Sequence, residues 1–284
     1  MAITIRDLLS DGKALLAQSG LEQVDAEHLM AHLLGISRMD LHNPVALENV
    51  LKTVGDEDEF ADSFAELIER RCSHEPLQYI TGRGYFRHLI IEVGPGVLVP
   101  RPESELLVEA VLQHISNLPG PVSVVDLGAG SGALGLAIAT ESEKARVALV
   151  ENSPRALEWL RKNVAALAED TRIVESDVAD ALEGVKCDVV IANPPYVPDS
   201  QDLPRDVISF EPHEALFGGA TGLEAPARFI AASARLLKSG GLLVIEHTET
   251  QGDAIAELLS EDFEDIVLHQ DLTQRPRWTS AIRR

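Results

Sequence analysis

The first part of the chain carries hydrophobic residues at the three- and four-residue spacing of amphipathic helices. Thr4 and Asp7 can form a capping box ahead of the first apolar series. The pattern predicts three helices, which begin near Thr4, Val24 and Asp56. We therefore expect residues 1–74 to form a small helical bundle, to which we assign substrate docking by elimination.

The pattern changes in residues 75–104, which glycines and prolines interrupt repeatedly. Apolar and polar positions alternate over Leu89–Val93, as in a short hairpin. These features predict a linker that contains a hairpin.

Residues 105–284 alternate between helical patterns and short, continuous apolar runs. Such runs are typical of parallel strands that helices cover on both faces, so an α/β domain is predicted. The last two strands, Phe263–His269 and Arg277–Ile282, have no clear helix between them, which fits an antiparallel pair. The other strands are expected at Val122–Leu127, Ala145–Val150, Arg172–Val174, Asp188–Ala192 and Gly241–Ile245.

A glycine-rich turn, Asp126-Leu-Gly-Ala-Gly-Ser-Gly132, follows the first of these strands and opens a helix. Glycines allow the backbone to turn tightly and to approach a cofactor closely. Gly130, Gly132 and Gly135 also match the spacing of dinucleotide-binding folds, so an NAD-type protein and a purely structural turn are both alternatives. Asp126 favours a positively charged ligand, S-adenosylmethionine, over a pyrophosphate.

Two acidic residues follow the next strands and extend this candidate cofactor site. Glu151 ends the second strand, where an acid can accept hydrogen bonds from the ribose hydroxyls of an adenosine. Asp177 follows the third strand, from which it can approach an adenine amino group, although a surface-loop role fits it equally well.

The tetrapeptide Asn193-Pro194-Pro195-Tyr196 follows the fourth strand and therefore faces the same crevice as the glycine turn. The two prolines fix the backbone and leave the Pro194 carbonyl free to accept a hydrogen bond. That carbonyl and the Asn193 side-chain oxygen can hold both protons of a planar NH2 group, with Tyr196 stacked on its face. This arrangement predicts methylation of an amide-like nitrogen.

The net charge of −22, from 24 Lys and Arg against 46 Asp and Glu, argues against a protein that binds bare nucleic acid. No apolar run is long enough for a membrane span, and no secretion signal precedes the first helix. Cys72 and Cys187 provide neither a disulfide framework nor a metal-ligand spacing. We therefore expect a cytoplasmic monomer without a metal.

Several segments together resemble the PrmC or HemK family of peptide chain release factor glutamine methyltransferases. The tetrapeptide at 193–196 is also found in adenine methylases of DNA, but the other segments narrow the resemblance. They are Glu75-Pro-Leu-Gln-Tyr-Ile-Thr-Gly82, Val99-Pro-Arg-Pro-Glu-Ser-Glu105, the glycine turn, Phe210-Glu-Pro-His-Glu-Ala-Leu216 and Gly240-Gly-Leu-Leu-Val-Ile-Glu-His247.

The resemblance implies a Rossmann-like class I S-adenosylmethionine-dependent methyltransferase sheet with a small N-terminal helical bundle. It implies that the target is the glutamine amide of a Gly-Gly-Gln loop in a release factor. The catalytic residues would be Asn193 and the Pro194 carbonyl, with Pro195 and Tyr196 beside them. The cofactor would contact Gly128, Ala129, Gly130, Ser131, Gly132, Glu151, Asp177, Val178, Asn193, Arg101 and Glu103.

Some positions depart from the family pattern. Val178 offers less stacking area for adenine than the Trp or Leu frequent there, and Thr248 replaces the usual glycine after Glu246-His247. The segment from Asp271 to Arg277 also lacks the usual glycine after its Asp-Leu. These differences concern affinity and loop shape more than the reaction class.

Two other functions remain as alternatives. A DNA or RNA adenine methylase also has to methylate a planar NH2 group. It would, however, have to flip its base out of the stack and bind nearby phosphates. A nucleotide-binding oxidoreductase or a non-catalytic scaffold would have no use for the tetrapeptide at 193–196.

Overall fold

The computed structural model describes residues 4–284, so the first three residues of the predicted bundle lie outside the described part. The chain divides into two compact units. One comprises Met1–Gly82 with Pro204–Phe210, and the other comprises Arg83–Leu203 with Glu211–Arg284. We refer to them as the helical unit and the sheet unit.

The three helices predicted in the helical unit are all present. The first begins with the expected capping box between Thr4 and Asp7, the second ends at Gly35 in the left-handed conformation, and Asp56 caps the third. These helices are α1 (Ile5–Gln18), α2 (Asp25–Leu34) and α4 (Glu57–Cys72). The apolar pattern did not predict the short elements η1 (Arg38–His42), α3 (Pro44–Leu51), α5 (Leu77–Thr81) and α9 (Arg205–Ile208).

Large apolar side chains from α1, α2 and α4 form the core of the helical unit. Leu16, Leu29 and Met30 are completely buried, and Phe64 is 2% exposed. Burial of one such side chain contributes roughly 1.5–3 kcal/mol. The aliphatic stripes read from the sequence are therefore core positions, as expected.

A seven-stranded sheet is the centre of the sheet unit, with strand order β10-β11-β9-β6-β3-β4-β5. The strands from β9 to β5 in this order run parallel, whereas β11 is antiparallel to β9 and β10, which confirms the predicted final pair. The strands are β3 (Val122–Leu127), β4 (Ala145–Glu151), β5 (Arg172–Glu175), β6 (Cys187–Ala192), β9 (Leu237–Glu246), β10 (Phe263–Gln270) and β11 (Pro276–Arg283).

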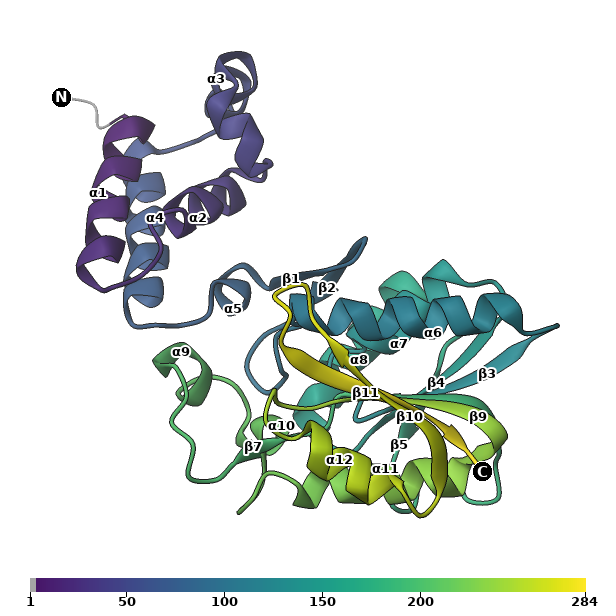
Figure 1. Cartoon of the computed structure of the whole chain (residues 1–284). Coiled ribbons are helices and arrows are strands. Elements are labelled where there is room, and N and C mark those ends of the chain that lie inside the picture. Colours follow the sequence, from purple (N-terminus) through teal and green to yellow (C-terminus); the bar gives the residue numbers. More distant parts are fainter. Residues whose placement is uncertain (1–3) are drawn as a thin grey trace. The chain divides into compact units, whose positions relative to one another are not determined.

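Helices cover both faces of this sheet, as the continuous apolar runs predicted (Figure 1). The first face is covered by α6 (Glu105–Asn117), α7 (Ala133–Glu141) and α8 (Pro154–Leu167), and the second by α11 (Glu224–Leu236) and α12 (Gly252–Leu259). Short elements lie near the carboxyl ends of the strands: η2 (Pro102–Ser104), β7 (Val197–Pro198), α10 (His213–Leu216) and β8 (Phe217–Gly219).

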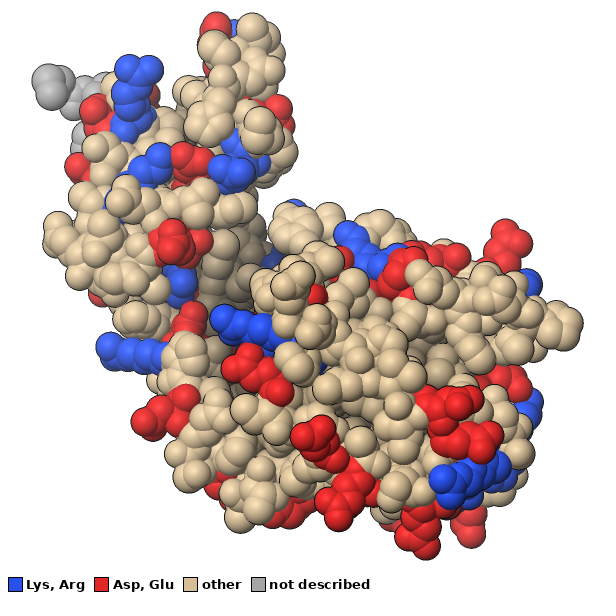
Figure 2. Space-filling view, viewed as in Figure 1, with Lys and Arg blue, Asp and Glu red and all other residues tan. Residues whose placement is uncertain are grey.

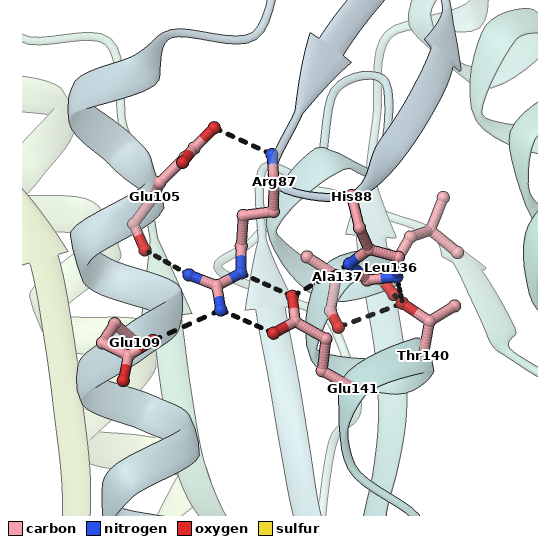
Figure 3. Close-up of polar contacts among 8 residues, drawn as sticks. All are labelled: Arg87, His88, Glu105, Glu109, Leu136, Ala137, Thr140 and Glu141. Atoms are coloured by element: carbon pink, nitrogen blue, oxygen red, sulfur yellow. Dashed lines mark hydrogen bonds and ion pairs between the residues drawn. The ribbon is translucent and has the colours of Figure 1, made fainter.

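The predicted hairpin is formed by β1 (Arg83–Phe86) and β2 (Leu89–Glu92), and Arg87 at its turn binds two helices (Figure 3). The guanidinium contacts Glu141 of α7 through two nitrogens, and one of these also reaches Glu109 of α6 at 3.2 Å. The backbone amide of Arg87 donates to Glu105 at 2.8 Å. One arginine thus ties the hairpin to the start of α6 and the end of α7.

We expect Arg87→Met to destabilise the sheet unit by about 1.5–3 kcal/mol at pH 7, because carboxylates lose a charged donor. The hydrogen bond from Arg87 lowers the pKa of Glu141 below its ordinary value of 4.5. The stabilisation is therefore complete above pH 4.5 and is lost as the pH falls through the lowered value. Urea unfolding of both proteins between pH 7 and pH 3 measures this difference.

Arg161→Met is the matched control, because Arg161 pairs with Glu175 at 2.7 Å while both side chains are more than half exposed. This pair should contribute less than about 1 kcal/mol. Equal losses for the two variants at pH 7 would contradict the anchoring role of Arg87.

Candidate active site

A cavity of about 390 Å3 lies at the carboxyl ends of the parallel strands, and the sheet unit provides all of its lining. This volume is in the range of small-molecule sites, and the place is where open α/β sheets bind their ligands. The lining brings together most of the residues that the sequence predicted for the cofactor. They are Gly128, Ala129, Gly130, Ser131, Glu151, Asp177, Val178, Asn193 and Arg101.

The glycine turn connects β3 to α7, and close packing explains one glycine of the turn and one in the first turn of α7. Gly128 has a φ of +70°, and a Cβ there would lie 2.9 Å from the ring of Phe229. A Cβ on Gly135 would lie 2.2 Å from Leu149 of β4, so α7 approaches the sheet as only glycine permits. Gly132, also expected to contact the cofactor, does not belong to the cavity lining.

Asp126 is completely buried and does not line the cavity, which corrects our interpretation of its charge. Its Oδ2 accepts a hydrogen bond from the amide of Gly135 at 2.9 Å, near the start of α7. Burial raises the pKa of Asp126 to about 7. The residue therefore holds the glycine turn against α7 and presents no carboxylate to a cationic ligand.

Glu151 lines the cavity and is anchored by three backbone amides. Its Oε2 accepts from Gly130 at 2.8 Å, and its Oε1 accepts from Asn152 at 2.9 Å and Ser153 at 2.8 Å. A carboxylate has about four acceptor positions, so about one is left for a ligand hydroxyl. The side chain is thus rigidly placed at the end of β4.

Arg228, which sequence reasoning missed, binds the carboxylate of Asp177. One guanidinium nitrogen lies 2.8 and 2.9 Å from the two carboxylate oxygens, and Asn152 donates to the same group at 3.3 Å. The Ala179 amide and Arg228 hold the pKa of Asp177 below its ordinary value. Asp177 and Arg228 both line the cavity, so a ligand there meets an ion pair instead of a free acid.

The tetrapeptide after β6 places one polar side chain in the cavity wall. Asn193 is half-buried and lines the cavity, and its Nδ2 donates to Ser104 Oγ at 3.3 Å. Pro195 also lines the cavity, whereas Pro194 and Tyr196 do not. Within residues 4–284, no hydrogen bond to the Pro194 carbonyl is formed.

Tyr196 donates its hydroxyl proton to Oε1 of Glu246 at 2.9 Å. Glu246 is 3% exposed and ends β9, the strand beside β6. Burial of the phenol is the main cause that raises the pKa of Tyr196 well above its ordinary value, and the charge of Glu246 is the second. The tyrosine hydroxyl is therefore neutral and fixed in direction.

The segment before α6 is held by an acid from the Phe-Glu-Pro sequence. Glu211 accepts from Arg101 at 2.6 Å and from the backbone amide of Val99 at 3.2 Å. The ion pair directs Arg101, which lines the cavity, while Glu103 is exposed and lies outside the lining. The sequence singled out the Phe-Glu-Pro segment but not the partner that Glu211 would bind.

Other residues of the site were not among the predicted catalytic or cofactor-binding residues. Asn163 of α8 joins the hairpin to the glycine turn, because its Nδ2 donates to the carbonyls of Glu92 and Ser131, at 2.9 Å each. Ser104 and Phe86 line the cavity although neither was predicted to bind the cofactor. A single buried polar side chain has no periodic pattern, so its partner cannot be read from spacing.

Solved structures with a similar fold include methyltransferases. The Thermus thermophilus 16S rRNA N2 G1207 methyltransferase, solved with AdoMet and guanosine, aligns with a TM-score of 0.53 and 24% identity. The alignment covers 71% of this chain and 50% of that one, so the chain spans half the length of that neighbour. This similarity confirms the class I methyltransferase fold.

Two family models match: the PrmC N-terminal domain over residues 7–82 and the methyltransferase small domain over residues 102–210. A release factor glutamine methyltransferase of Mycolicibacterium smegmatis is 39% identical over 290 residues, covering 98% of both chains. One from Bifidobacterium longum is 38% identical and covers 98% of this chain and 99% of that one. The chain is therefore a methyltransferase that belongs to the release factor glutamine methyltransferase family.

Proposed function

We propose that this enzyme transfers a methyl group from S-adenosylmethionine to the side-chain amide nitrogen of the glutamine in a Gly-Gly-Gln loop of a peptide chain release factor. The observation that carries the proposal is the orientation of Asn193. Its amide nitrogen is bound to Ser104, while the residue lines the same cavity as the glycine turn. An oxygen acceptor is thus offered to a planar NH2 group.

The residues of the cavity fit the proposed cofactor. The backbone of the glycine turn permits close approach, and Glu151 keeps about one acceptor position for a ribose hydroxyl. Asp177, Val178 and Arg228 would surround the adenine. S-adenosylmethionine, when bound, supplies a methyl group on a positively charged sulfur. Roles for Gly132 and Glu103 in cofactor binding stay predictions from the sequence.

The proposed methyl transfer relies on the orientation of the glutamine amide more than on a general base that removes a proton from it. An amide nitrogen is a poor nucleophile, because its lone pair is delocalised into the carbonyl. The Asn193 side-chain oxygen and the Pro194 carbonyl would accept both amide protons, fix the nitrogen and favour positive charge as it develops. Tyr196 would lie beside the amide, its hydroxyl held by Glu246. Orientation of this kind contributes several kcal/mol, about 7–11 at most.

A protein partner fits the charge of the molecule better than a nucleic acid. Asp and Glu exceed Lys and Arg by 22, and the face in Figure 2 shows many acidic side chains over the sheet unit. Neutralising phosphates would require a basic surface.

We propose that the enzyme acts as a cytoplasmic monomer. Over residues 4–284, no helix is long and apolar enough to cross a membrane.

Transfer of labelled methyl tests the proposed function, with a release factor, its Gln→Ala loop variant and duplex DNA as substrates. We expect label on the glutamine-containing protein alone. Asn193→Ala should lower kcat/KM by about 100- to 1,000-fold, the loss found when one positioned hydrogen-bonding group is removed. Asn117→Ala, at the exposed end of α6, is the matched control and should leave activity unchanged. Label on DNA, or on the Gln→Ala variant, would refute the proposal.

We also propose that the helical unit docks the release factor, because one glutamine loop offers little surface for recognition. Deleting residues 1–73 should then weaken binding of the release factor by at least about tenfold, or about 1.4 kcal/mol. Cofactor affinity should be retained, because the sheet unit provides the whole cavity lining. Calorimetric titration with each ligand measures both. Unchanged affinity for the release factor would exclude a docking role.

A further inference from the structure

A chain of hydrogen bonds lies behind Asn193 and ends on the buried carboxylate of Glu246. Ser104 donates its hydroxyl proton to Glu246 Oε2, and Tyr196 donates to Oε1 at 2.9 Å. Ser104 in turn accepts from Asn193 Nδ2 at 3.3 Å. Ser104 and Glu246 are each only 3% exposed, so water does not compete for these contacts.

Three elements bring these residues together. In the parallel pair β6 and β9, Ala192 lies opposite Ile245, so Asn193 and Glu246 both follow directly at the same edge of the sheet. Ser104 ends η2, directly before α6. The sequence separation of Ser104 and Glu246 is 142 residues, so only the tertiary fold creates this contact.

The direction of each hydrogen bond follows from the donors and acceptors available. An ionised carboxylate only accepts, and a serine hydroxyl has a single proton. Since Ser104 gives that proton to Glu246, it can offer only lone pairs to Asn193. It therefore binds the NH2 end of the Asn193 amide, and the carbonyl end is left for a ligand.

We propose that Ser104 and Glu246 are positioning residues that fix which end of the Asn193 amide faces the substrate. Glu246 acts through Ser104 and touches neither substrate nor cofactor. The proposal rests on the proposed function, in which the Asn193 oxygen accepts a proton of the glutamine amide. Without the carboxylate, Ser104 can direct its proton at Asn193, and the amide can turn its nitrogen toward the substrate.

Because the orientation of Asn193 depends on the charge of Glu246, we expect kcat to depend on pH. The titratable or charged groups that act on it are Tyr196, Glu103 and Arg277, besides the hydroxyl of Ser104. Burial raises the pKa of Glu246 above its ordinary value, and Glu103 adds to this effect. Protonated Glu246 can donate to Ser104 or Tyr196, so kcat should fall as the pH drops through this raised value. In Glu246→Gln this acidic limb should disappear.

Steady-state kinetics with the full-length enzyme test the inference. Ser104→Ala should lower kcat by about 10- to 100-fold, with the KM for the release factor and the affinity for S-adenosylmethionine changed less than about threefold. Ser104→Thr, which keeps the hydroxyl, should recover most of the loss. Ser233→Ala is the matched control, because Ser233 is fully buried in α11, donates to the Phe229 carbonyl and should leave kcat unchanged.

A second measurement does not depend on the substrate. In nuclear magnetic resonance spectra, the Asn193 side-chain NH2 is assigned by its disappearance in Asn193→Asp. Its protons should exchange slowly in the wild-type enzyme and in Ser233→Ala, and rapidly in Ser104→Ala. Fast exchange in the wild-type enzyme would overturn the inference.

The kinetic outcomes separate this inference from the proposed function. An active wild-type enzyme with unchanged kcat in Ser104→Ala would overturn the positioning role alone. Equal losses in Ser104→Ala and Ser104→Thr, together with weaker cofactor binding, would mean a structural role and would also overturn it. If the wild-type enzyme transferred no methyl to any release factor, the proposed function would fail, and the exchange rates would still decide the orientation of Asn193.

Discussion

The parallel alignment of β3, β4, β6 and β9 is the constraint on which the rest of the sheet unit depends. Parallel neighbours end at the same edge of a sheet, so the segments after these strands meet although they are far apart in the chain. The glycine turn, Glu151, Asn193 and Glu246 all follow or end such strands. The site is therefore a direct consequence of strand direction.

Buried carboxylates at this edge are stabilised in different ways. Asp126 accepts from one backbone amide, and burial raises its pKa to about 7. Glu151 accepts from three amides, and Glu246 accepts from two hydroxyl groups. An unpaired buried charge is costly, so each of these contacts offsets a desolvation penalty. The same contacts make the groups rigid, and a rigid acceptor favours one ligand orientation.

Ion pairs from separate segments complete the walls of the cavity. Arg87 fixes the hairpin that carries Phe86, and Glu211 holds Arg101 before α6. Arg228 binds Asp177 across the adenine end of the proposed cofactor site. Each pair joins residues that are more than 50 positions apart in the sequence, so the walls of the cavity depend on the complete sheet unit.

The sequence by itself determined the three main helices of the helical unit, the positions of the main strands along the chain, and the place of the glycine turn and of Asn193 after two of these strands. These features depend on local patterns, namely apolar periodicity, caps and prolines, which act within a few residues. Only the tertiary structure decided that Asp126 is buried away from the cavity and that Asp177 forms an ion pair with Arg228. It also decided that Ser104 links Asn193 to Glu246. An isolated polar residue belongs to no periodic sequence pattern, so the topology of the fold and the burial of the residue decide which group it contacts.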